Sequence, residues 1–391
     1  MQDLINKFEH VYIDAKAEDS ALAERLRRLF PAERLSRVDS PPGPGGELSA
    51  REFARSKRLL FVTPFKGRFF KRCPGSRPGL SCCNYFVLNW GLQCDMNCSY
   101  CYLQSFINTN MLTIYSNLAD AMAELRELGA TMGEQALRVG TGETVDSLSL
   151  DPLTMYSRDL IALFRDYPKW TLEFKTKSDR VDQFLDCEHA GNVVVSWSVN
   201  PQHIIDHEEH GTASLAQRLQ AAEKCLQKGY RLSFHIDPMI WHPDWRANYG
   251  GLIDAICSRF TPAQVPYLSV GALRFQPQQR AMMRERFGLK SYVTQAEMFP
   301  SSDGKLRYDS HLRQEMFQFV LERFRGHSTD WRVFMCMETP ETWLKTTGDS
   351  PFKKPEMKDL FDPAVARAGQ VAADRMADFK KPEAEKRPGC R

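Results

Sequence analysis

Three cysteines lie close together in the chain, and their spacing is the strongest chemical signal in the sequence. Cys94, Cys98 and Cys101 follow a C-x3-C-x2-C pattern. Thiolates on one short loop can bind three irons of a [4Fe-4S] cluster, and a pattern without a fourth cysteine leaves one iron open. A zinc knuckle fits this spacing less well, because zinc sites favour C-x2-C pairs with two further ligands. The loop therefore predicts an iron–sulfur cluster with an open iron.

An open iron suits S-adenosylmethionine, because the amino and carboxylate groups of this cofactor can chelate the metal. An electron from the cluster then cleaves the sulfonium and yields a carbon radical. We therefore predict a radical enzyme with a [4Fe-4S] cluster and S-adenosylmethionine as cofactors, and with an electron donor such as flavodoxin or ferredoxin as partner. A non-catalytic iron–sulfur protein remains open as a different class of function.

The composition is that of a globular chain, with 391 residues of which 42% are hydrophobic. No apolar run reaches the roughly 20 residues that cross a bilayer, so we expect neither export nor a membrane anchor. We expect a monomer in the cytoplasm. In that reducing compartment the 11 cysteines are not expected to form disulfides.

Charge gives only a local hint about partners. The formal net charge of +3 is too small to indicate a polyanionic partner by itself. Four basic side chains between Lys66 and Arg72 flank Phe69 and Phe70, a pattern compatible with phosphate contacts and base stacking. A solvated basic strand end explains the same pattern equally well, so both interpretations stay open.

Six apolar runs alternate with helical segments from residue 85 onward. The runs cover residues 85–90, 136–140, 171–176, 193–199, 231–237 and 267–273. Such alternation is typical of right-handed βαβ units, and six of them make an open partial barrel with the helices outside. We predict an α/β fold with a partial (β/α)6 radical-SAM barrel at 85–275, an N-terminal region at 1–84, a C-terminal closing region at 276–345 and a partly disordered tail at 346–391.

Candidate cofactor ligands follow the predicted strands, where the chemistry of such barrels gathers. Glu143 lies behind Gly142 and is predicted to accept hydrogen bonds from the cofactor's ammonium, and Lys177 is predicted to pair with its carboxylate. Ser198 and Asn200 follow the fourth strand. Arg274 follows the sixth strand and is a predicted substrate-binding residue.

The predicted helices include 117–128, ended by Gly129, and 212–228, with Thr212 as N-cap. A helix is also expected at 310–325, and the apolar run 331–337 is predicted to close the open edge of the sheet. That run carries Cys336.

Several other polar and thiol groups allow more than one interpretation. Cys73, Cys82 and Cys83 fit either a second metal or small buried residues under the cluster. Three histidines between 203 and 210 have the spacing of a metal site on one helix face, but their acidic neighbours, including Glu208 and Glu209, favour an exposed helix end.

The cysteine loop and the residues after it resemble the spore photoproduct lyase family of radical S-adenosylmethionine enzymes, in particular its branch of DNA repair photolyase-like proteins. The similarity extends from the N-terminus to about residue 325. The segments that carry it are Val11-Tyr12-Ile13, Tyr102-Leu103-Gln104 after the loop, Asp151-x-Leu153-Thr154, Thr176-Lys177-x3-Val181-Asp182, Ser198-x-Asn200, Gly211-Thr212 and Arg274-Phe275.

The resemblance implies a lyase-like DNA repair reaction in which a 5′-deoxyadenosyl radical abstracts hydrogen from a thymine dimer. It assigns cofactor binding to Lys177 and Ser198, and it places Tyr100 and Tyr102 beside the cluster, with one of them returning hydrogen. The family's hydrogen-donating cysteine is replaced here by the segment around Glu143. Cys336 is therefore a candidate replacement donor, and a buried core thiol is the alternative interpretation, since free cysteines are commonly buried. A radical enzyme acting on a peptide or small metabolite stays open as the alternative to a nucleic-acid substrate.

Overall fold

The computed structural model describes residues 1–43, 48–77, 79–107 and 109–362. Within them, one sheet has the strand order β18-β14-β13-β11-β10-β9-β5-β4. Neighbouring strands are parallel throughout, except that β4 runs antiparallel to β5. The strands are β4 (Phe70–Arg72), β5 (Tyr85–Leu88), β9 (Leu137–Gly140), β10 (Trp170–Thr176), β11 (Val193–Ser198), β13 (Arg231–Met239), β14 (Tyr267–Ala272) and β18 (Val333–Met335).

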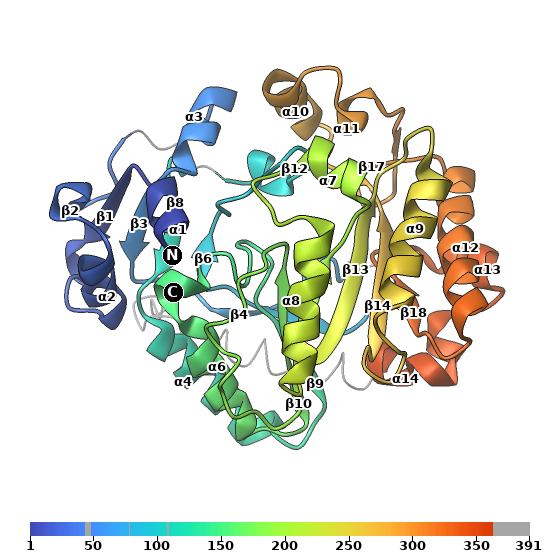
Figure 1. Ribbon diagram of the computed structural model, residues 1–391, viewed down its shortest axis with the longest axis horizontal. Coiled ribbons are helices and arrows are strands. Elements are labelled where there is room, and N and C mark those ends of the chain that lie inside the picture. Colours follow the sequence, from blue (N-terminus) through green and yellow to red (C-terminus); the bar gives the residue numbers. More distant parts are fainter. Residues whose placement is uncertain (44–47, 78, 108, 363–391) are drawn as a thin grey trace, which may run out of the picture.

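The six predicted strands correspond to β5, β9, β10, β11, β13 and β14, which are adjacent and in chain order. Every residue of β11 and β14 is buried, as expected for parallel strands covered on both faces. Helices pack outside the curved sheet (Figure 1). They are α4 (Leu118–Met132), α6 (Tyr156–Arg165), α8 (Leu215–Gln227), α9 (Trp245–Cys257) and α12 (Ser310–His327). The predicted α/β partial barrel is confirmed.

A second sheet lies beside the barrel and has the order β2-β1-β3-β8-β6 (Figure 1, blue and cyan). Its strands are β1 (His10–Asp14), β2 (Leu35–Val38), β3 (Leu59–Thr63), β6 (Gly91–Leu92) and β8 (Leu112–Tyr115). The accompanying helices are α1 (Gln2–Lys7), α2 (Ala21–Leu29) and α3 (Ala50–Ser56). Because β6 and β8 flank the cysteine loop in the chain, this loop is tied to both sheets.

The C-terminal part closes the barrel on one side. β18 pairs with β14, so the predicted closing role of the run 331–337 agrees with the structure. Ser81 N donates to the Glu338 carbonyl at 2.9 Å, so the chain after β4 meets the chain after β18. The remaining elements are α10 (Gln279–Phe287), α11 (Tyr292–Gln295), α13 (Pro340–Thr347), α14 (Lys358–Phe361) and a small sheet of β15 (Arg274–Phe275), β16 (Phe299–Pro300) and β17 (Leu306–Arg307).

Two predicted helix ends are wrong. α4 passes through Gly129 and continues to Met132, where Gly133 is the C-cap. α8 begins after Ser214, whose side chain forms a capping box with Gln217, so the N-cap is not Thr212.

Of the predicted tail, residues 363–391 lie outside the described residues. Among the helices of the described part, none is both long and apolar enough to cross a membrane.

Candidate active site

The cysteine loop is held by the chain that follows β11. Its short strand β7 (Asn97–Cys98) pairs antiparallel with β12 (Glu209–His210). Ser99 N adds a hydrogen bond to the carbonyl of Glu208 at 2.8 Å. Cys98 is buried by this pairing, whereas Cys94 and Cys101 stay partly exposed. The loop thus lies at the carboxyl ends of the barrel strands, as predicted.

The three thiols have the chemistry of a cluster site. No group of three or more His, Cys, Asp or Glu side chains in the described parts of the chain is arranged to hold a single metal ion. A [4Fe-4S] cluster needs each thiolate on a different iron, so the three thiols need not converge on a single ion. Burial raises the pKa of Cys98 to about 12, against the lowering influence of Lys177. Metal binding would have to displace that proton.

Two consecutive glutamates at the end of α7 (Gln202–Glu208) and in β12 hold the loop side chains. The Glu208 carboxylate accepts from Ser99 Oγ, from Ser291 Oγ at 2.7 Å and from Tyr292 N at 2.7 Å. Because Ser291 and Tyr292 lead into α11, Glu208 ties the loop to the helical cover of the mouth. Both glutamates are buried, so the predicted exposed helix end is wrong for them, whereas Asp206, His207 and His210 are exposed as predicted.

Glu209 forms an ion pair with Arg218 at 2.7 Å, and both side chains are fully buried. Its other oxygen accepts from Tyr100 Oη and from Asn200 Nδ2. Burial would raise the pKa of Glu209, but Arg218 and Lys177 together hold it below its usual value. A permanent carboxylate therefore lies directly behind the cysteine loop.

Lys177 lies on the open side of this carboxylate, with Nζ 5.6 Å from the centre of the Tyr100 ring. Burial lowers the pKa of Lys177, but the charges of Glu209 and Cys98 more than offset this and raise it overall. Lys177 therefore places a protonated ammonium group next to the cysteine loop.

Glu143 lies across from the other loop tyrosine. Its carboxylate accepts from Asn89 Nδ2 at 2.9 Å, and its backbone carbonyl accepts from Tyr102 Oη at 2.7 Å. Burial raises the pKa of Glu143 above its usual value, partly offset by Asn89 and Lys71.

The two tyrosines beside the loop have different surroundings. Tyr100 is 8% exposed and its hydroxyl is bonded to buried Glu209. Tyr102 is 42% exposed. Of these two, Tyr102 is the one accessible from solvent.

Ser198 and Asn200 lie at the end of β11 and are buried. Both ends of the Asn200 amide are bonded within the protein, to Glu209 at 2.8 Å and to Tyr249 Oη at 2.9 Å. The Ser198 carbonyl accepts from Arg218 at 2.7 Å. Both residues therefore belong to the network around Glu209.

Arg274 and Cys336 meet at the far side of the mouth. Arg274 forms a bidentate pair with Asp237 at 3.0 and 3.1 Å, and its Nη2 lies 3.9 Å from Cys336 Sγ. A Cβ on Gly271 would lie 2.7 Å from Asp237, so this pair requires a glycine in β14. Burial raises the pKa of Cys336 to about 12, reinforced by Asp237.

Comparisons with known proteins agree with this geometry. A family model described as spore photoproduct lyase matches residues 42–305, which is more than half of the chain. The chain belongs to the spore photoproduct lyase family. The predicted resemblance is thereby confirmed.

Two of the curated relatives that match this chain show the extent of the similarity, and each is named spore photoproduct lyase. The protein from Geobacillus sp. (strain Y412MC61) is 29% identical over 197 residues, covering 50% of this chain and 58% of its own length. The Bacillus subtilis (strain 168) protein is 27% identical over 255 residues, covering 63% and 72%. The chain thus spans little more than half of the Geobacillus relative in that match.

Solved spore photoproduct lyase structures have the same fold. One variant matches with a TM-score of 0.74 and 22% identity, covering 84% of this chain and 98% of the other. Another, with bound AdoMet and dinucleoside spore photoproduct, matches with a TM-score of 0.72 and 23% identity, covering 83% and 98%.

Cys73, Cys82 and Cys83 lie close enough for their charges to influence one another. The charges of Cys336 and Cys82 both act on Cys73, whose pKa burial raises to about 11. Cys83 Sγ accepts from Arg138 at 2.9 Å. Within the described residues these cysteines are not part of a group of three or more side chains arranged to hold a single metal ion.

Two weaker sequence hints are resolved by the structure. Phe69 and Phe70 are each 1% exposed, so the base-stacking part of the basic-segment interpretation is wrong. His203 and His207 contact Tyr292 and each other, whereas His210 stacks on Phe287, so the three imidazoles do not converge.

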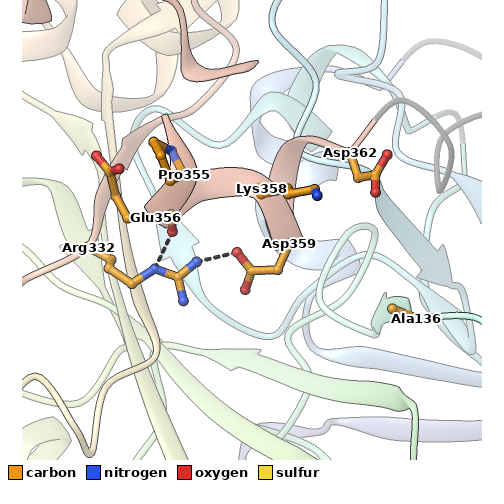
Figure 2. A pocket seen from close by; sticks show the side chains of 7 residues that line it. All are labelled: Ala136, Arg332, Pro355, Glu356, Lys358, Asp359 and Asp362. Carbon is orange, nitrogen blue, oxygen red and sulfur yellow. Dashed lines mark hydrogen bonds and ion pairs between the residues drawn. The ribbon is translucent and has the colours of Figure 1, made fainter. Parts of the chain in front are cut away.

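A hollow with a volume of about 600 Å³ lies at the opposite end of the sheet. Figure 2 shows Arg332 there, bonded to the Glu356 carbonyl and to Asp359. Ala136 and Arg332 precede β9 and β18, so this hollow is at the amino ends of the strands. It is remote from the cysteine loop and contributes nothing to the candidate active site.

Glu208, Glu209, Arg218 and Gln279 are the site residues that sequence reasoning missed. Gln279 is fully buried, and its Nε2 donates to the carbonyls of Tyr100 at 3.1 Å and Cys101 at 3.0 Å. Of these four residues, only Arg218 had a local signal in the sequence. The capping box of Ser214 and Gln217 fixes the start of α8 and hence the position of Arg218 on that helix.

Proposed function

We propose that this protein is a radical S-adenosylmethionine enzyme that acts on a damaged pyrimidine in DNA, as a lyase of the spore photoproduct type. The observation that carries the proposal is the cysteine loop at the carboxyl ends of the barrel strands, backed by the buried Glu209–Arg218 pair. The titles of the related structures, which name AdoMet and dinucleoside spore photoproduct, support the same cofactor and substrate class.

Cys94, Cys98 and Cys101 would hold the [4Fe-4S] cluster. When bound, the cluster and S-adenosylmethionine supply a carbon radical. Lys177 would attract the carboxylate of S-adenosylmethionine, because its raised pKa keeps the ammonium protonated beside the loop. Glu143 would accept from its ammonium.

Ser198 and Asn200 would act mainly by holding Arg218 and Glu209 in place, given the partners of their polar groups. Tyr100 shares this support, because its hydroxyl is already donated to Glu209. Tyr102 is the better candidate for hydrogen transfer, since it is exposed at the mouth.

Cys336 would donate a hydrogen atom to the product radical. A donor must keep its S–H bond, and burial keeps this thiol protonated at neutral pH. Cys73 is the competing thiol, because burial and the charges of both Cys336 and Glu143 raise its pKa.

Cations around the mouth suit a nucleic-acid substrate. Arg274 is the predicted substrate-binding residue, and its charge and those of Arg307 and Arg77 act on nearby Lys305. Arg274 is paired with Asp237 and Arg307 with Asp303, so Lys305 and exposed Arg77 are the cations that we expect to contact phosphate. A flipped or protruding base would enter between these cations and Tyr102.

The partners and boundaries remain part of this proposal. We expect a flavodoxin or ferredoxin as electron donor, a cytoplasmic monomer, and the regions 1–84, 85–275, 276–345 and 346–391 as units of organisation.

The decisive experiment is anaerobic. Reconstituted and reduced protein is incubated with S-adenosylmethionine, with and without dinucleoside spore photoproduct, and the products are separated by chromatography. We expect 5′-deoxyadenosine, together with repaired thymidine when the lesion is present. Cofactor cleavage without lesion reversal would indicate a peptide or small metabolite as substrate. No cleavage by reduced, iron-loaded protein would indicate a non-catalytic iron–sulfur protein.

A further inference from the structure

A buried lysine from the N-terminal region reaches under the cysteine loop. Lys57 follows α3 and is 7% exposed. Its Nζ donates to the carbonyls of Cys94 at 2.7 Å and Met96 at 2.6 Å, and it lies 5.0 Å from the centre of the Phe53 ring. The ammonium therefore contacts the loop backbone at the first predicted iron ligand.

Lys57 differs from the other lysine that meets this loop. Lys7 pairs with the Asp95 carboxylate at 2.6 Å. Lys57, in contrast, has no carboxylate within ion-pair distance among the residues that the structure describes, although its charge acts on the Cys94 thiol. An unpaired buried cation is costly, by several kcal/mol, unless an anion compensates it.

A second cation lies over the ring of the same phenylalanine. The Arg286 guanidinium, on α10, lies 4.6 Å from the centre of the Phe53 ring. It donates to Gln104 Oε1 at 2.6 Å and to Asn97 Oδ1, so it also holds the loop. Within the described part of the chain no carboxylate pairs with it either, and the charge of Cys101 acts on it. Two unpaired cations thus flank the loop, near its first and last cysteines.

Three thiolates make a loaded cluster site anionic, and reduction adds a further negative charge. Buried cations stabilise the more negative state more strongly, because Coulomb interactions are larger where water is excluded. Net charge and hydrogen bonding around a cluster set its reduction potential.

We propose that Lys57 and Arg286 are positioning residues that hold the cysteine loop and raise the reduction potential of the cluster bound there. This inference rests on the proposed function, since it needs the cluster. In the reduction an electron passes to the cluster from a low-potential one-electron donor, and no bond is formed or broken. The N-terminal region would then contribute to electron uptake without supplying a ligand.

The test is a redox titration of the reconstituted full chain, followed by the electron paramagnetic resonance signal of the reduced cluster. Lys57→Met keeps the apolar stem and removes the charge. We expect unchanged iron and sulfide content and a more negative potential. At a fixed potential the reduced fraction should fall about tenfold, which corresponds to about 59 mV for a one-electron couple.

Lys57→Arg is the matched variant, because it keeps the charge and should restore most of the wild-type potential. Lys169→Met is the control, since Lys169 is exposed, paired with Glu134 and located before β10. It should leave the potential unchanged. Arg286→Met provides an independent measurement with the same expected direction if Lys57→Met loses iron.

A wild-type potential in iron-loaded Lys57→Met or Arg286→Met would overturn the inference and leave the proposed function intact. A shift of equal size in Lys57→Arg would also overturn it, because the effect would then depend on packing and not on charge. Wild-type protein that binds no iron would overturn the proposed function itself.

Discussion

The two sheets are built alike but end differently. In both, apolar parallel strands are covered by helices, with Val11 and Leu60 buried in the N-terminal sheet as Val194 and Val270 are in the barrel. At the carboxyl ends of β1 and β3, Asp14 simply accepts from Thr63 Oγ1 at 2.7 Å. The barrel strands end in thiols, lysines and carboxylates that face a common mouth.

The barrel therefore supplies the candidate catalytic groups, and the N-terminal region supplies side chains that support the cysteine loop. All three thiols of the loop and its acidic anchors belong to the chain between β5 and α8. The N-terminal region contributes cations that contact the loop from behind, namely Lys7 and Lys57. Substitutions in the two regions should therefore have different kinds of effect.

The largest expected effect is loss of the cluster. Cys98→Ala removes one of only three predicted thiolate ligands, so we expect reconstituted protein without the iron–sulfur absorbance and without bound sulfide. Cys187→Ala is the control, because Cys187 is a free cysteine in the loop before β11. Retention of a full cluster by Cys98→Ala would bring Cys73, Cys82 and Cys83 back as ligands.

The next effect is on folding stability, and it compares the two regions directly. Glu209→Gln leaves the Arg218 guanidinium buried without its counter-ion, which should lower the free energy of unfolding by about 3–5 kcal/mol. Glu18→Gln breaks an exposed pair with Arg37 in the N-terminal region and should have no measurable effect. Denaturant unfolding of the two variants measures both, and equal losses would contradict the division between regions.

The barrel could be predicted from the sequence because its strands are continuous apolar runs. β11 is fully buried, and few other structures accommodate such a segment between helices of this length. The cysteine loop could be predicted because its spacing has few structural alternatives.

The acidic anchors could not be predicted, for a physical reason. Glu208 and Glu209 occur among polar residues, a pattern that normally marks solvent exposure. Their burial depends on Arg218 in the next helix and on Ser99 and Ser291, which lie 109 and 83 residues from Glu208. Local periodicity holds no information about such pairing, and only the assembled fold brings the partners together.

A smaller effect concerns the products and not the binding of cofactors. Cys336→Ala should leave iron content and cofactor cleavage unchanged, since this thiol is on the Arg274 side of the mouth. If it donates hydrogen, the repaired thymidine product should decrease several-fold while side products increase. Cys73→Ala is the matched variant. A changed product ratio in Cys73→Ala alone would assign the donor role to Cys73.

The smallest effect is a pH dependence of nucleic-acid binding. Burial and the charge of Arg274 lower the pKa of Lys305 to about 8, and nearby Asp303 offsets this only partly. Below that pH the ammonium is available to a phosphate, and above it the contact is lost. The affinity of the wild-type protein for short DNA should therefore fall as pH rises through about 8, while Lys305→Met should bind more weakly and show less change. Fluorescence anisotropy at constant ionic strength measures both curves. The slope of affinity against salt should also be smaller by about one in Lys305→Met, as expected for a single lost phosphate contact.

Folding stability should change in the opposite direction: the unfolded chain keeps this lysine protonated up to its usual pKa, so stability rises with pH between the two values. Opposite pH trends for binding and stability distinguish a phosphate contact from general weakening of the fold. Parallel curves for wild type and Lys305→Met would place the DNA contacts elsewhere around the mouth.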